Sequence, residues 1–265
     1  MLGTVGFPRV VGLALGLAMA GDSAPVASKL SPASVLGWQR YAAAVEARRV
    51  GERRDTERFL ALDFLPDAAT ERRTVMAGNL VVKSMDAHVD VPSAMVHHWR
   101  GAVFLPGTTL ERLMATLETE APPTGPEVLK ATVLSRAPGS MRLFLRLQRT
   151  KFVTVVYNTE HDVAFARDGA GRASSVSVAT KIAEVADANK ASEHELPPGD
   201  DSGYLWRLNA YWRYQTVPGG VIAECESISL SRDVPFGLQY ITGPLIRSTA
   251  RESMTRALEE IRKRG

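Results

Sequence analysis

The chain of 265 residues is 45% hydrophobic and 23% charged, a composition typical of one globular domain with short additions. Its formal net charge of +3 is the difference between 32 Lys and Arg and 29 Asp and Glu, and these charges are scattered along the chain, which argues against a nucleic-acid partner. A single cysteine, Cys225, excludes an intrachain disulfide, and its position in a strand-like run favours a buried thiol over a nucleophile.

The first 20 residues have the pattern of a secretory signal peptide. Arg9 precedes an apolar run, residues 10–20, which ends in the small-x-small sequence Ala18-Met19-Ala20. The run is too short to span a bilayer as a helix, which needs about 20 residues. We therefore expect cleavage after Ala20 and an exported, periplasmic or secreted protein with no transmembrane segment in its mature chain; a buried first helix is the alternative.

Residues 21–78 are expected to form a linker and an N-terminal helical extension. Ser31-Pro32 has the sequence of a helix start, and the apolar spacing continues to about residue 53. Residues 59–65 are apolar and typical of a short strand, and residues 66–77 are expected to form a second, mostly polar helix.

The remainder, residues 79–265, is expected to form one domain. Two strands, at residues 80–85 and 94–105, precede a helix that starts at a capping-box pattern, Thr108-Thr109-Leu110-Glu111. Six runs with strand periodicity follow, at residues 127–136, 141–148, 152–167, 173–187, 204–216 and 221–232. Turn residues separate these runs, which favours an antiparallel sheet over βαβ units.

Residues 244–263 have helical periodicity. The expected apolar stripe of this helix comprises Ile246, Ala250, Met254, Ala257, Leu258 and Ile261. This stripe must be buried, and the concave face of the strand meander is the one large apolar surface left for it.

This order of elements resembles the helix-grip fold of the START and polyketide-cyclase (SRPBCC) superfamily, which includes the birch-pollen-allergen-like proteins. Residues 108–128 (TTLERLMATLETEAPPTGPEV) and 231–238 (SRDVPFGL) are similar to the segments that follow the first strand and precede the grip helix there. The whole chain looks most like uncharacterised exported bacterial members of that group. The resemblance implies an α+β domain whose curved antiparallel sheet wraps on the C-terminal helix. It also implies a cavity between them for a lipid or another hydrophobic small molecule.

Several aromatic residues are candidates for the wall of such a cavity. Strand alternation over residues 204–214 places Tyr204, Trp206, Trp212 and Tyr214 on one face. The full set of candidate ligand-binding residues is Trp99, Tyr157, Tyr204, Trp206, Trp212, Tyr214, Met254 and Leu258. Plain core packing against the terminal helix is the alternative role for these side chains.

The alternative function is an enzyme of the cyclase, aromatase or hydrolase type, in which an inward His97 or His161 works with Glu224 or Glu226. His97 and His98 are adjacent, so only one of them can face inward, and a core role is favoured for it. The two glutamates share one strand face, and we expect them to be solvated. No metal, nucleotide or serine-nucleophile motif is present in the sequence, so no cofactor is expected. A third possibility is a scaffold whose N-terminal helices dock on a partner; the oligomeric state is not predicted.

Overall fold

The computed structural model describes residues 29–85, 91–150, 154–233 and 239–265. The expected signal peptide, residues 1–20, lies outside these residues. In chain order the elements are α1 (Pro32–Arg53), the 3-10 helix η1 (Ala61–Phe64), α2 (Ala68–Met76), β1 (Val81–Ser84), β2 (Ala94–Pro106), α3 (Leu110–Thr119), β3 (Val128–Ala137), β4 (Ser140–Thr150), β5 (Thr154–Arg167), β6 (Arg172–Ala186), β7 (His194–Glu195), β8 (Arg207–Val217), β9 (Gly220–Arg232) and α4 (Gln239–Arg264).

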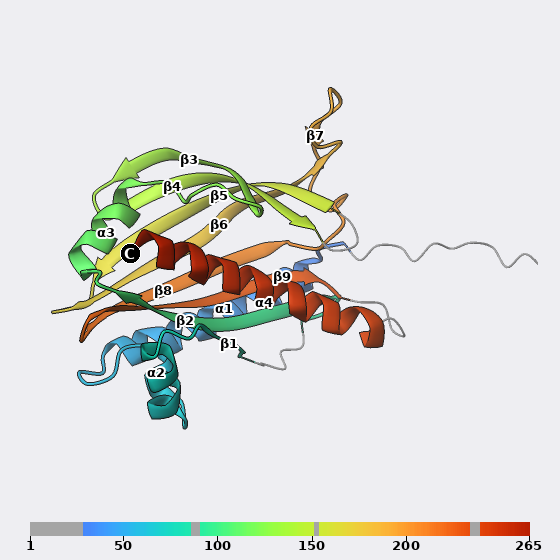
Figure 1. Cartoon of the computed structure of the whole chain (residues 1–265). Helices are drawn as coiled ribbons and strands as arrows, with labels where there is room; N and C mark the ends of the chain where they lie inside the picture. Colours follow the sequence, from blue (N-terminus) through green and yellow to red (C-terminus); the bar gives the residue numbers. More distant parts are fainter. Residues whose placement is uncertain (1–28, 86–90, 151–153, 234–238) are drawn as a thin grey trace, which may run out of the picture.

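The strands form one antiparallel, curved sheet with helices on both faces (Figure 1). The strand order is β1-β2-β9-β8-β6-β5-β4-β3, and the short β7 pairs with β6. The second strand of the chain, β2, pairs with the last strand, β9, over its whole length. The pairing of β2 with β9 places residues from the start and the end of the domain side by side.

The long helix α4 crosses the concave side of the sheet, which we call the inner face (Figure 1). Met254, Leu258 and Ile261 of its apolar stripe are buried against β2, β8 and β9, together with α3. Gly101 on β2 allows this close packing, because a methyl group there would lie 2.5 Å from Leu258 Cδ1. The α+β helix-grip arrangement expected from the sequence is confirmed.

The opposite side of the sheet, the outer face, is covered by the N-terminal extension. Trp38, Tyr41 and Val45 of α1 are buried against β8 and β9. The segment around η1 and the helix α2 cover the neighbouring part of β2 and β9, where Ala102 and Ile222 are fully buried. The central strands are therefore covered on both faces, in three layers.

Local sequence signals account for most element boundaries. The hydroxyl of Ser31 accepts a hydrogen bond from the Ser34 N–H at the start of α1, as expected. The cap of α3 is Thr109, one residue later than the capping-box pattern suggested. The strand expected at residues 59–65 is wrong: the segment forms η1, because the Asp63 carboxylate accepts from the N–H groups of Phe59 and Leu60 and holds a turn.

Candidate functional site

A row of neighbouring side chains crosses the middle of the inner face. Ser177 on β6 pairs with Ala210 on β8, and Ala210 pairs with Ser227 on β9. Trp99 on β2 pairs with Ser227 and ends the row. We call these four residues the inner row. All four are half-buried, so solvent-sized space reaches this part of the concave side even though α4 lies on it.

Two tryptophans flank the small residues of the inner row. Trp99 stands at one end, and Trp212 lies two residues from Ala210 on the same face of β8. The Trp212 ring stacks on Tyr214, with ring centroids 6.0 Å apart and an interplanar angle of 3°. Tyr214 is 2% exposed, whereas both tryptophans are half-buried. Partly open aromatic faces beside small side chains form a surface suited to an apolar ligand.

His161 on β5 lies next to the inner row. Its Nδ1 is 3.3 Å from the Ser177 hydroxyl, and its Nε2 is 3.0 Å from the Thr159 hydroxyl. Burial lowers the pKa of His161 to about 4, against the opposing effect of the Asp162 charge. The imidazole is therefore neutral at pH 7, and its contacts are to hydroxyl groups.

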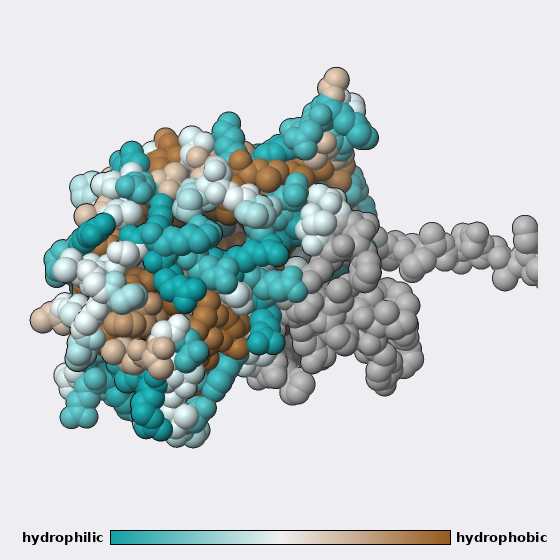
Figure 2. Space-filling view, in the orientation of Figure 1, coloured by the Kyte–Doolittle hydropathy of each residue, from teal (hydrophilic) through white to brown (hydrophobic). Residues whose placement is uncertain are grey.

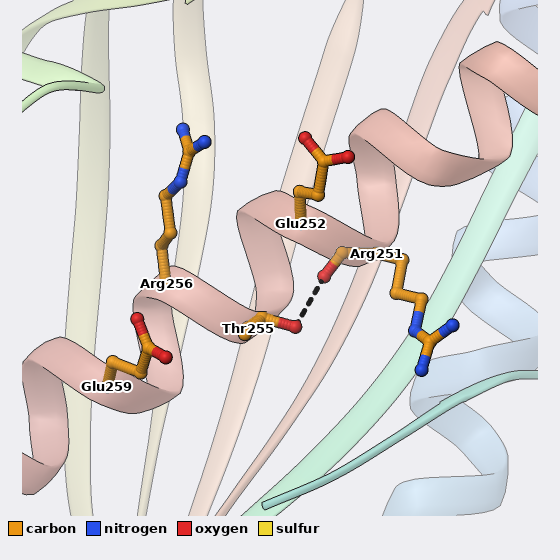
Figure 3. A pocket seen from close by; sticks show the side chains of 5 residues that line it. All are labelled: Arg251, Glu252, Thr255, Arg256 and Glu259. Carbon is orange, nitrogen blue, oxygen red and sulfur yellow. Dashed lines mark hydrogen bonds between the residues drawn. The ribbon is translucent and has the colours of Figure 1, made fainter.

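Charged side chains lie on the exposed side of α4. The exposed side of α4 borders an open hollow of about 350 Å³ (Figure 3), and its lining residues are Arg251, Glu252, Thr255, Arg256 and Glu259. Arg256 also pairs with Glu127, which in turn accepts from Arg149 on β4 at 3.1 Å. In the space-filling view, hydrophilic residues cover α4 and hydrophobic residues are visible on both sides of it (Figure 2).

The predicted ligand-binding residues divide between the two faces. Trp99 and Trp212 are half-buried on the inner face, and the fully buried Tyr214 supports Trp212. Tyr157 lies on the inner side of β5 but is 2% exposed, and burial raises the pKa of its hydroxyl. Met254 and Leu258 are buried in the apolar contact between α4 and the sheet.

The placement of Trp206 and Tyr204 on the inner face is wrong. Strand β8 begins only at Arg207, so the alternation that fixes Trp212 does not extend back to these two residues. Trp206 packs against α1 on the outer face, and its Nε1 donates to Asp201 at 2.9 Å. Tyr204 is 46% exposed and lies beside the Arg232 guanidinium, whose central carbon is 5.0 Å from the ring centroid.

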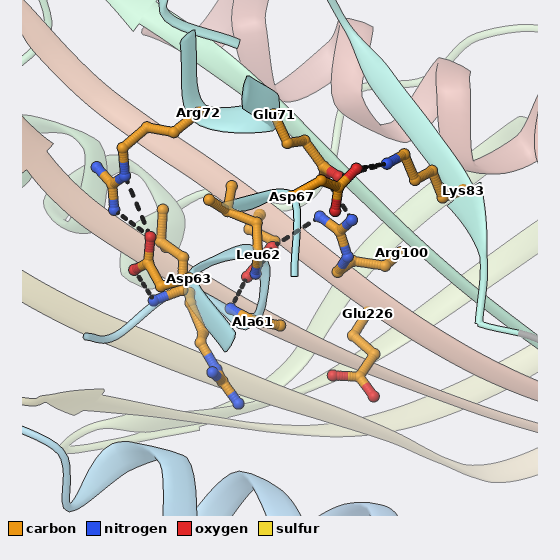
Figure 4. Close-up of polar contacts among 12 residues, drawn as sticks. Ala61, Leu62, Asp63, Asp67, Glu71, Arg72, Lys83, Arg100 and Glu226 are labelled. Atoms are coloured by element: carbon orange, nitrogen blue, oxygen red, sulfur yellow. Dashed lines mark hydrogen bonds and ion pairs between the residues drawn. The ribbon is translucent and has the colours of Figure 1, made fainter. Parts of the chain in front are cut away.

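The expected solvation of Glu224 is also wrong. This side chain is 1% exposed and lies on the outer face, between β9 and the N-terminal extension. Its partners Ala61, Leu62 and Arg100 are labelled in Figure 4. Its carboxylate accepts from the N–H groups of Ala61 and Leu62 and from Arg100, the last at 3.1 Å. Arg100 pairs with Glu71 of α2 as well. Burial raises the pKa of Glu224, and the arginines and N–H groups oppose that shift.

Glu226 is the second buried carboxylate of this outer-face network. It accepts from His98 Nε2 at 2.7 Å and from Arg48 of α1, while His98 Nδ1 lies 2.5 Å from the Tyr41 hydroxyl. Burial alone would raise the pKa of Glu226, but the His98 hydrogen bond and the charges of Arg48 and Arg49 outweigh burial and lower it to about 2. The network therefore joins α1 to the sheet through ionised groups.

These positions bear directly on the enzyme alternative. Of the adjacent histidines, His97 faces inward and contacts the Ser231 hydroxyl at 2.9 Å, whereas His98 faces outward. His161 is inward too, but both glutamates are on the outer face, so the expected inward His/Glu pair does not form. The histidine–carboxylate pair that does form, His98 with Glu226, is covered by α1.

Three further observations concern possible metal sites, reactive groups and membrane-spanning segments. Within the described ranges, no group of His, Cys, Asp and Glu has an arrangement that could hold a metal ion. Cys225 is 3% exposed beside α4, and burial raises the pKa of its thiol, as the sequence suggested for an inert cysteine. No described helix is both long and apolar enough to cross a membrane.

The hydroxyl side chains of the inner face were not predicted from the sequence. Ser177, Ser227 and Thr159 come from three different strands, and only the pairing register brings them near Trp99 and His161. The available signal was small polar residues at inward positions of apolar strands, where larger side chains are usual. This signal can be used only when it is known which alternating side chains of each strand face inward.

Comparison with known proteins gives a likeness of fold. No family model and no curated protein matches the chain. Among solved structures it is similar to a STAR-related lipid transfer protein from Xanthomonas axonopodis (12% identity over 66% of this chain and 98% of that one, TM-score 0.40). It is also similar to the lipid transfer and protein localization domain of human StarD13 (8%, 76% and 96%, TM-score 0.42) and to the Zhui aromatase/cyclase from Streptomyces sp. R1128 (13%, 64% and 93%, TM-score 0.33).

Proposed function

We propose that this protein binds a hydrophobic small molecule or lipid on the inner face, between α4 and the central strands; we call this proposed binding region the groove. The observation that carries the proposal is the half-buried state of Trp99 and Trp212 inside an otherwise well-packed domain. A fully packed core would cover such large apolar rings, since burying one contributes roughly 1.5–3 kcal/mol. A bound apolar ligand would complete that burial.

A binding role is favoured over a catalytic one by the position of the ionisable groups. General acid–base catalysis needs a proton donor and acceptor within hydrogen-bond reach of the same reacting group. His161 faces the groove, whereas Glu224 and Glu226 face α1 and η1 across the sheet. A neutral histidine between hydroxyls can orient a ligand but has no carboxylate to work with there.

The test is mass spectrometry of solvent extracts from protein purified under native conditions. We expect one class of apolar compound in near-stoichiometric amount, and a strongly reduced amount from the Trp99→Ala and Trp212→Ala variants. Trp206→Ala is the matched control, because Trp206 lies on the outer face and should retain the compound. An empty native protein that also binds no uncharged apolar dye in solution would contradict the proposal.

We further propose that the protein is exported after cleavage behind Ala20. The support is the apolar run of residues 10–20 followed by small residues. N-terminal sequencing of protein from the periplasm or medium should begin at Gly21. An intact Met1 on cytoplasmic protein would contradict export without affecting the binding proposal.

A further inference from the structure

A directed chain of hydrogen bonds runs behind the groove and determines which group can bind at its floor. The Thr159 hydroxyl donates to the Leu145 carbonyl oxygen at 3.1 Å. A hydroxyl has a single proton, so Thr159 can only accept from His161, whose Nε2 lies 3.0 Å away. His161 Nε2 is therefore the protonated nitrogen of the ring.

The neutral state of His161 fixes the next link. With a pKa near 4, the ring has one proton at pH 7, and that proton is on Nε2. Nδ1 is then an acceptor, and its partner at 3.3 Å is the Ser177 hydroxyl. Ser177 consequently donates its proton away from the groove. Its oxygen keeps only lone pairs for a ligand, and Ser177 is half-buried in the inner row, where a ligand can reach it.

Among the described residues, the inward positions of β8 and β9 beside the inner row carry no charge. The inward positions of β8 and β9 beside the inner row hold Leu208, Trp212, Cys225 and Ser229. The charged residues of these two strands, including Glu224 and Arg213, point to the outer face. A charged ligand group placed against the inner row would lose its hydration without gaining an opposite charge.

From this geometry we propose that the ligand is an uncharged, mainly apolar molecule with a hydrogen-bond-donating hydroxyl group, which donates to Ser177 Oγ. This inference rests on the proposed binding function and specifies its ligand. Ser177 would contact the ligand, and His161 would be a positioning residue that turns the serine proton away. An ether oxygen at the same place has no proton to donate, so its lone pairs would repel those of Ser177 Oγ. A carboxylate would add a negative charge to that repulsion.

The test compares three probes of similar length by displacement of the uncharged dye Nile red from the full-length mature protein. The probes are 1-dodecanol, its isomer 1-methoxyundecane, and dodecanoate at pH 8. We expect 1-dodecanol to displace the dye at a concentration at least tenfold lower than either of the others. The first two probes have the same atoms and differ in the ability to donate, so their ratio reports the hydroxyl proton alone.

Two variants locate the effect. Ser177→Ala should reduce the preference for 1-dodecanol over 1-methoxyundecane to within about twofold, because the acceptor is gone. His161→Leu should do the same by raising the affinity for the ether, since the freed Ser177 proton can then point into the groove. Ser175→Ala is the control on the same strand and face, because Ser175 contacts the Tyr214 hydroxyl and not His161. Circular dichroism checks that each variant is folded, and Ser177→Ala decides alone if His161→Leu is not.

The outcomes separate the two proposals. Equal displacement by 1-dodecanol and 1-methoxyundecane, or an unchanged preference in Ser177→Ala, would overturn the ligand assignment while leaving apolar binding in place. Tighter binding of dodecanoate would overturn it as well. Absence of Nile red binding by the wild-type protein would instead remove the proposed function itself.

Discussion

Replacement of Glu226 by Gln removes one charge from the outer-face network and keeps the size of the side chain. The pKa of Glu226 falls from 4.5 to about 2 in the folded protein, which corresponds to about 3 kcal/mol of stabilisation at neutral pH by linkage. An independent figure agrees, because removal of one member of a buried ion pair costs about 3–5 kcal/mol. At roughly 2–4 °C per kcal/mol for a domain of this size, Glu226→Gln should melt about 6–12 °C below wild type at pH 7.

The pH dependence of the folding stability is a second test of the Glu226 interaction. The folded-state pKa is lowered, so the stabilisation is fully present above pH 4.5 and is lost as the pH falls through about 2. Wild type should therefore approach Glu226→Gln in melting temperature between pH 4.5 and pH 2. Thermal unfolding followed by circular dichroism at several pH values measures both effects.

A matched control separates buried from exposed carboxylates. Glu160 pairs with Arg142 at 2.8 Å on the exposed side of β4 and β5, where such a pair is worth less than about 1 kcal/mol. Glu160→Gln should change the melting temperature by no more than about 2–4 °C. A Glu226→Gln loss no larger than that of Glu160→Gln would refute the claim that the network stabilises the docking of α1.

Three further predictions concern packing. Gly101→Ala should cost about 1–3 kcal/mol in denaturant unfolding, because its methyl group would lie 2.5 Å from Leu258 Cδ1; an unchanged midpoint would mean that α4 does not pack closely here. Cys225 should react with an aromatic disulfide reagent only in denaturant, since it is 3% exposed with a raised pKa, and rapid labelling of the native protein would contradict that burial. Deletion of residues 1–78 should give insoluble protein, because it uncovers Ile222, Glu224 and Glu226 on the outer face; a soluble, folded fragment would show that the extension is dispensable.

The sheet and the grip helix could be predicted because their signals are local. Alternation at Met141, Leu143 and Leu147 is a period-2 pattern that any half-buried strand must show, and the structure places these residues in β4 with their side chains buried. The stripe containing Met254 and Leu258 likewise has a helical period that only a one-sided contact explains. Each of these patterns is complete within a dozen residues.

The outer-face network could not be predicted because it depends on contacts between segments far apart in the sequence. Glu224 and Glu226 alternate with Ala223 and Cys225, a pattern that is equally compatible with water or with a second covering layer. The two possibilities are distinguished only by the docking of α1 on this face. Glu226 pairs there with Arg48, which is 178 positions away in the sequence. The same reasoning applies to the hydroxyl chain at His161, whose members come from β4, β5 and β6.

The most direct measurement of the central claim uses the four tryptophans: Trp99 and Trp212 lie on the inner face, whereas Trp38 of α1 and Trp206 pack in the cluster on the outer face. One variant keeps the inner pair (Trp38→Phe with Trp206→Phe), and the other keeps the outer pair (Trp99→Phe with Trp212→Phe). Titration with a long-chain alcohol that carries bromine on its chain should quench the fluorescence of the first variant and leave that of the second nearly unchanged. Equal quenching of both variants, or quenching of the outer pair alone, would contradict binding in the groove.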